Sequence, residues 1–182
     1  MSNPDASLQY RMKDGTGYQV QLCIEPDTKH TISFLKDQIS IGFKSLSNHS
    51  RMTRFASPIN RLSDRQLDYL TNLDGKNRVA WCAFIDTEGE EKGLGLGRYM
   101  KLPDHENIAE FAITVVDGYQ GQGVGFQLLT KLIASAKENS FHKLRGYVMK
   151  DNKPMLALCK RFDSKKQCVD GPFVILDILV ND

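Results

Sequence analysis

The sequence has no Cys-x-x-Cys pair, and none of its four histidines lies at zinc-finger spacing from a cysteine, so we expect no metal site. It also lacks an apolar run of the roughly 20 residues that a membrane-spanning helix requires. The polar N-terminus has no apolar signal core. A formal net charge of +2 is too small to indicate a nucleic-acid or membrane partner. These absences predict a reduced, cytoplasmic protein.

What the chain does contain is typical of a globular protein. Its 182 residues are 41% hydrophobic and 25% charged, and this length is enough to bury a core. No internal repeat or low-complexity linker divides the sequence, so we predict a single domain over residues 1–182. Cys23 and Cys82 lie inside apolar runs, where a thiol is usually a small core residue.

Hydrophobic periodicity predicts a central sheet covered by helices, an α+β or mixed α/β fold. Ser63 and Gln66 have the spacing of a capping box and predict the start of a helix. The glycines of residues 93–97 alternate with leucines, and we interpret them as a strand with a bulge or a close backbone approach. Residues 48–61 are predicted to be a polar connection. The predicted strands are 18–25, 78–86, 107–116, 143–150 and 172–180, and the predicted helices are 31–47, 63–73, 129–139 and 152–162.

Three glycines spaced by two, Gly121, Gly123 and Gly125, lie between a predicted strand and a predicted helix. The backbone N–H groups of such a turn converge where the helix dipole also favours an anion, and phosphate is the usual ligand. A Walker A motif needs a Lys and a Ser or Thr after its last glycine, and the Rossmann motif needs the spacing G-x-G-x-x-G. Neither pattern is present. The glycines therefore predict an anion-binding loop of another class, with a purely structural turn as the alternative.

The pattern Q-x-x-G-x-G, formed by Gln120, Gly123 and Gly125, resembles the signature of the GNAT superfamily of acetyl-CoA-dependent N-acetyltransferases. The resemblance implies a mostly antiparallel sheet with a V-shaped opening between two central parallel strands, and acetyl-CoA as co-substrate. It also implies which residues bind coenzyme A: the loop holds the pyrophosphate, the preceding strand pairs with the pantetheine arm, and an asparagine contacts that arm. These cofactor-binding residues are Ile113, Thr114, Val115, Gln120, Gly121, Gln122, Gly123, Val124, Gly125 and Asn152.

A narrower likeness links residues 109–125 and 43–58 to the catalytic domain of bacterial protein lysine acetyltransferases of the Pat type. The likeness implies that this chain is that domain alone, and that Arg51 and Arg54 belong to a segment near the acceptor. It also implies a primary amine as acceptor, with protein lysine ahead of a small polyamine. We expect the acceptor to enter past residues 48–61 and the loop of Asp104 and Glu106. The expected state is a monomer or a homodimer.

Glu110 is the predicted catalytic residue. Apolar residues surround it on a central strand, where desolvation raises the pKa of a carboxylate and makes it a plausible general base. The GNAT resemblance implies the same role. Two alternatives remain open: the side chain points to solvent, or it pairs with Arg98 or Arg145. The function that follows is acetyl transfer to an amine, with a non-catalytic acyl-CoA sensor or a ligand-free structural domain as alternatives.

The group that protonates the departing thiolate is not settled by the sequence. Many GNAT enzymes have a tyrosine seven residues after the asparagine, and Cys159 occupies that position here. We interpret Cys159 as a core thiol on a helix face. Solvent, Tyr147 or Tyr119 could take over the general-acid step.

Overall fold

A computed structural model describes residues 8–23, 32–57 and 59–180. In this part of the chain, eight strands form one sheet in the order β1-β2-β3-β4-β5-β6-β8-β7. Every neighbouring pair is antiparallel except β5 and β6, which are parallel. The strands are β1 (Leu8–Arg11), β2 (Gly17–Cys23), β3 (Arg78–Thr87), β4 (Glu90–Lys101), β5 (Ile108–Val115), β6 (Lys143–Met149), β7 (Lys165–Asp170) and β8 (Phe173–Leu179).

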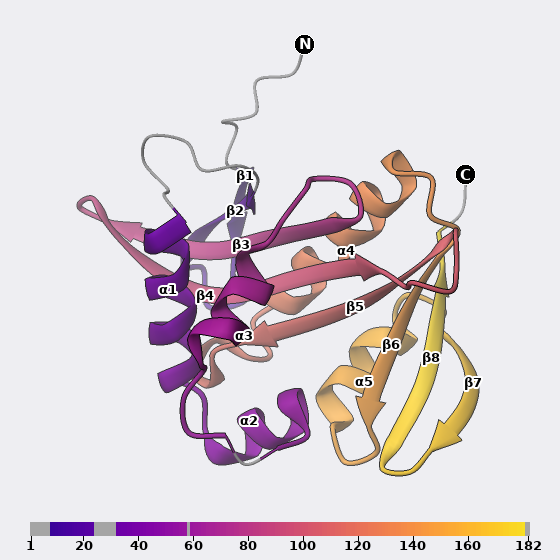
Figure 1. The fold of residues 1–182 in the computed structure, drawn as a ribbon. Coiled ribbons are helices and arrows are strands. Elements are labelled where there is room, and N and C mark those ends of the chain that lie inside the picture. The colour runs from indigo at the N-terminus through magenta and orange to yellow at the C-terminus, as the bar shows by residue number, and fades with distance from the viewer. Residues whose placement is uncertain (1–7, 24–31, 58, 181–182) are drawn as a thin grey trace.

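Helices cover both faces of the sheet (Figure 1). On one face lie α1 (Ile32–Lys44), α2 (Asn48–Phe55) and α3 (Asp64–Thr71). On the other lie α4 (Val124–Glu138) and α5 (Lys153–Lys160), whose apolar side chains share a buried core with β3, β5, β6 and β8. Among the described residues, no helix is long and apolar enough to cross a membrane.

The two parallel strands separate soon after they meet. They pair only over residues 108–110 of β5 and 143–145 of β6, at the start of both strands. Beyond that point they diverge, and Figure 1 shows the V-shaped opening between them. The mixed α+β fold and this opening confirm the predicted fold class.

The predicted strands and helices are present, with residues 24, 25 and 31 of two predicted segments outside the described residues. The capping box at the start of α3 is confirmed: Gln66 N donates to Ser63 Oγ at 3.3 Å and Ser63 N donates to Gln66 Oε1 at 2.8 Å. The close approach at the alternating glycines is also confirmed. A Cβ on Gly95 of β4 would lie 2.8 Å from the backbone oxygen of Thr114.

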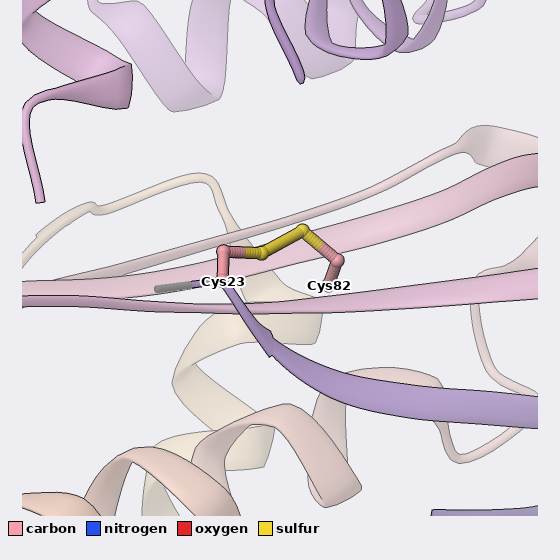
Figure 2. Close-up of a disulfide and its surroundings, with 2 residues drawn as sticks. All are labelled: Cys23 and Cys82. Atoms are coloured by element: carbon pink, nitrogen blue, oxygen red, sulfur yellow. A yellow bond between two sulfur atoms is a disulfide. The ribbon is translucent and has the colours of Figure 1, made fainter. Parts of the chain in front are cut away.

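Three expectations about the fold are wrong or incomplete. Residues 48–55 are not part of a polar connection but form α2, whose first turn is capped by Ser47 Oγ accepting from Ser50 N at 3.1 Å. The edge strands β1 and β7 were not predicted. Cys23 and Cys82 are not core thiols, because a disulfide joins them (Figure 2).

The β2–β3 register explains the disulfide. Cys82 pairs with Gln21, and Cys23 pairs with Ala80, so the two cysteines are diagonal neighbours on the same face of the sheet. Their Cα atoms lie 6.5 Å apart although 59 positions separate them along the chain.

Candidate active site

A cavity of about 590 Å³ occupies the opening between β5 and β6. All of the predicted catalytic and cofactor-binding residues except Gln122 and Val124 line this cavity. From β5 and the glycine loop come Glu110, Ile113, Thr114, Val115, Gln120, Gly121, Gly123 and Gly125, and from the start of α5 comes Asn152. The fold thus brings together residues that are up to 42 positions apart.

The glycine loop leads from β5 into α4 in a backbone conformation that requires glycine. Gly121 has a φ of 73° and Gly123, the N-cap of α4, has a φ of 100°, both in the left-handed region. A glycine N-cap has no side chain to accept from the first N–H groups of the helix. These donors and the positive end of a 15-residue helix make the N-terminus of α4 suitable for an anion.

The side chains of the remaining two loop residues, Gln122 and Val124, do not line the cavity. Val124 is fully buried and packs with Leu128 of α4 in the core next to β2 and β3. Gln122 Oε1 is buried and has no hydrogen-bond partner among the described residues. Any contribution of these two residues to the cavity comes from the backbone.

One edge of β5 has free backbone groups along the cavity. Ile113, Thr114 and Val115 pair with β4 on one side, but β6 has already diverged on the other. A strand edge of this kind can pair with an extended ligand that carries amide groups. Gln120 Nε2 donates to Val115 O at 3.0 Å and so closes the end of this edge beside the loop.

Asn152 lies at the far side of the opening. Its Oδ1 accepts from Met155 N at 3.2 Å and caps α5, which fixes the side chain at the cavity wall. The cap uses the oxygen of the amide, and its nitrogen donor has no partner among the described residues.

Glu110 faces α2 and α3 from the floor of the site, and burial raises the pKa of its carboxyl. The cations of Arg54 and Arg98 oppose this effect and lower the same pKa. Glu110 forms no direct ion pair with either arginine among the described residues. Arg145, its neighbour on β6, is engaged with Asp177 of β8 through bonds of 2.7 and 2.9 Å. The carboxylate is therefore desolvated but not neutralised by a close partner.

Arg54 of α2 also lines this cavity. Its Nε donates to Thr114 Oγ1 at 3.0 Å, on the same face of β5 as Glu110. Burial, with Arg98 nearby, lowers the pKa of Arg54 to about 10. Only the Pat-like pattern in residues 43–58 pointed to this arginine.

Asp117 holds α2 against the glycine loop. Its carboxylate accepts from the hydroxyls of Ser47 and Ser50, both at 2.8 Å, and from Ser47 N at 2.9 Å. Burial raises the pKa of Asp117, but these hydrogen bonds outweigh it and the pKa is lowered overall. Gln120 Nε2 also reaches Ser50 Oγ at 3.3 Å. The wall that carries Arg54 is thus anchored to the loop.

Of the three residues considered for protonating a thiolate, only Tyr147 borders the cavity. Cys159 is fully buried in the core, and burial raises the pKa of its thiol to about 11. This agrees with its interpretation as a core residue. Tyr119 lies beneath the Lys92 ammonium, 5.4 Å from the ring centroid, and lines no part of the cavity.

Two cations near the loop were not predicted from the sequence. Lys13, in the turn between β1 and β2, and Arg161, after α5, both line the cavity. The Arg161 guanidinium also stacks on Phe126, 4.2 Å from the ring centroid. No group of three or more metal-ligating side chains gathers anywhere in the described ranges.

A second cavity, also of about 590 Å³, lies between α1 and the same face of the sheet. Its wall is mostly apolar and includes aliphatic and aromatic side chains of α1, and the Cys23–Cys82 disulfide lies on the sheet side. The two cavities share a boundary made of Leu46, Arg54, Phe55 and Thr114. No pattern in the sequence predicted this space.

Comparisons with known proteins agree with this geometry. A sequence model of the acetyltransferase (GNAT) family matches residues 46–163. The chain is 32% identical over 114 residues to "Acetyltransferase PA5475" of Pseudomonas aeruginosa, which covers 63% of this chain and 61% of that protein. It is 25% identical over 155 residues to "Acetyltransferase Pat" of Mycolicibacterium smegmatis, covering 85% of this chain and 43% of that protein. The chain thus spans less than two thirds of the length of either relative.

Solved structures show the same fold. The GNAT domain of S. lividans PAT superposes with a TM-score of 0.80 at 23% identity, covering 95% of this chain and 96% of that one. A cAMP-binding acyltransferase from Mycobacterium smegmatis superposes with a TM-score of 0.63 at 20% identity, covering 97% of this chain and 48% of that one.

Proposed function

Because the chain belongs to the GNAT family of acetyltransferases, we propose that it transfers an acetyl group from acetyl-CoA to a primary amine, with Glu110 as general base. The observation that carries this proposal is that a desolvated carboxylate, a free strand edge and an uncapped helix N-terminus all border one cavity. These are the parts that amine acylation needs: a base, a cradle for an extended thioester and a site for its phosphates.

The residues present fit coenzyme A. Its pyrophosphate would be held by the backbone of residues 120–125, with Lys13 and Arg161 as nearby countercharges. The free edge of Ile113, Thr114 and Val115 would pair with the amides of the pantetheine arm, and Asn152 would contact the arm from the other side. In this assignment Gln122 and Val124 act through their backbone alone.

In the proposed reaction Glu110 takes a proton from the acceptor ammonium, directly or through a water molecule. The neutral amine then attacks the thioester carbonyl, the C–S bond breaks, and the acetylated nitrogen loses its second proton to water to give the amide. A backbone N–H near Val115 stabilises the oxyanion that forms on the carbonyl oxygen. Tyr147, which unlike Tyr119 lines the cavity, protonates the departing thiolate.

Two acceptors follow from the sequence resemblance: a protein lysine, and behind it a small polyamine. The charges at the cavity wall help to rank these two acceptors. Glu110 is the only carboxylate among the described residues that line it, against the cations Lys13, Arg54 and Arg161. A polycation meets repulsion at such a wall, so a polyamine is the weaker candidate. Asp104 and Glu106, expected at the entrance, line neither cavity.

The test is incubation of the protein with acetyl-CoA and separate pools of lysine peptides, polyamines and amino acids, read by mass spectrometry. Any amine that gains an acetyl group in an enzyme-dependent reaction supports the proposal. If the protein binds acetyl-CoA but acetylates none of these amines, the alternative of a non-catalytic acyl-CoA sensor takes its place.

A further inference from the structure

The candidate active site contains more buried positive than negative charge. Arg98 is only 6% exposed and Arg54 is partly buried, and both guanidinium groups face the single carboxylate of Glu110. Arg54 bonds to Thr114 through Nε, packs over the Phe55 ring and is attracted by the charge of Glu110, but it forms no close ion pair among the described residues. A desolvated cation without a close counterion is costly, and a ligand anion would offset that cost.

The second observation is the apolar cavity beside Arg54. Its wall contains large apolar side chains from α1 and from the sheet, and its volume of about 590 Å³ is in the range of small-molecule sites. It meets the cavity of Glu110 at Arg54 and Thr114. The apolar side chains at its wall are Phe34, Leu35, Ile39, Phe43, Phe84 and Leu96.

The third observation concerns order along the strand. Glu110 and Thr114 lie on the same face of β5, four residues apart, and Arg54 is bonded to Thr114. A base, a cation and an apolar space therefore follow one another across the floor of the site.

We propose that the acceptor is a free α-amino acid with a large apolar side chain. Its ammonium faces Glu110, its carboxylate pairs with Arg54, and its side chain enters the cavity between α1 and the sheet. This inference rests on the proposed acetyl transfer and names the acceptor class for it. A lysine side chain or a polyamine brings no anion to Arg54 and no bulky apolar group to the second cavity.

The proposal is tested with matched acceptors and acetyl-CoA, by measuring release of the coenzyme A thiol. Phenethylamine is phenylalanine without its carboxylate, and serine is an amino acid without the apolar ring. We expect kcat/KM for L-phenylalanine to exceed that for either compound by at least tenfold. In the Arg54→Gln variant, kcat/KM for L-phenylalanine divided by kcat/KM for phenethylamine should fall toward one, because only the amino acid loses a carboxylate contact.

A pair of isoleucines on α1 tests the cavity separately. Ile39 lines it, whereas Ile41 is 55% exposed and lines neither cavity. Ile39→Trp is expected to fill the space and to raise KM for L-phenylalanine severalfold relative to L-alanine. Ile41→Trp, the same change on the same helix, should leave KM for both acceptors unchanged from the unsubstituted protein. Thermal unfolding of both variants verifies that they fold.

Three results overturn the inference. Equal kcat/KM for L-phenylalanine and phenethylamine would exclude a carboxylate site at Arg54. Acetylated lysine peptide or polyamine with untouched amino acids would replace the acceptor class while leaving acetyl transfer in place. Bound acetyl-CoA with no acetylated amine of any kind would remove the proposed function itself, and the acceptor class with it.

Discussion

Arg54 of α2 donates a hydrogen bond from Nε to Thr114 Oγ1 of β5 across 60 positions of the chain. Thr114 belongs to the strand that carries Glu110, and Arg54 belongs to a helix fastened to the glycine loop through Asp117. Hydrogen bonds therefore connect the strand of Glu110, the glycine loop and the boundary between the two cavities. Substitutions at any one of them are expected to act on ligand binding or turnover rather than on the core.

The glycine loop gives the first prediction. Gly123→Val should weaken acetyl-CoA binding at least tenfold, about 1.4 kcal/mol, because a side chain would occupy the space beside the helix N-terminus. The φ of 100° adds strain of roughly 1–3 kcal/mol to the folded protein. Isothermal titration with acetyl-CoA and chemical denaturation measure the two effects.

A matched glycine separates strain from binding. Gly89, in the β3–β4 turn, has a φ of 88° and open space around it, and it lines neither cavity. Gly89→Val should lower stability similarly without changing the affinity for acetyl-CoA. A folded Gly123→Val protein with unchanged affinity would exclude phosphate binding at this loop.

The alternating glycines of β4 give a prediction about packing. Gly95→Ala should lower the free energy of unfolding by roughly 1–3 kcal/mol, since its Cβ would lie 2.8 Å from Thr114 O. Gly93→Ala is the control, because among the described residues its added Cβ would have only Gln38 Oε1 within 4 Å, at 3.8 Å. Urea denaturation of both variants measures their free energies of unfolding. Equal values for Gly95→Ala and Gly93→Ala would show that β4 can shift to accommodate the added Cβ.

Much of this fold was predictable because the relevant signals are local. The capping box of α3 needs only Ser63 and Gln66. The glycine loop can be recognised from its position between a predicted strand and a predicted helix. The edge strand β7 was missed because all of its residues are exposed and it carries no apolar alternation. Helix α2 was missed because it buries no residue and depends on Asp117, 70 positions from Ser47.

The Cys23–Cys82 disulfide was also hidden from the sequence, because it depends on the β2–β3 register. Alkylation of the denatured protein without reductant should modify only Cys159 and Cys168, the two free cysteines. Closing a loop of this length stabilises a protein by roughly 4 kcal/mol. Reductant should therefore destabilise the unsubstituted protein but not a Cys23→Ala, Cys82→Ala double variant. Four alkylated cysteines without reductant would contradict the disulfide.

The partners of the candidate site were less predictable than its loop. Glu110 and the glycines lie within one segment of 16 residues, with the glycines in the GNAT signature and Glu110 on the strand before it. Arg54, Lys13 and Arg161 come from three other elements, so only the folded sheet shows that they border the same cavity. The cavity under α1 has no sequence signature, because its lining residues have the same periodicity as a filled core.

Electrostatics around Glu110 give a prediction about pH. The Arg54 cation lowers the pKa of Glu110, so Arg54→Gln should raise that pKa and move the acidic limb of kcat/KM to higher pH. Arg51→Gln is the control: Arg51 lies on the same helix, and its Nε is bonded to Leu46 O. An acidic limb at the same pH in all three proteins would show that another group sets it.

The most direct test of the account is the turnover of Glu110→Gln with acetyl-CoA and the best acceptor of the panel, measured by thiol release from neutral to alkaline pH. Glutamine keeps the size of the side chain but cannot accept the proton, so turnover at neutral pH should fall by ~10²–10⁴-fold. It should recover in part at high pH, where the amine is already neutral, and acetyl-CoA affinity should barely change. Equal turnover of both proteins at neutral pH would contradict the assignment of Glu110 as general base.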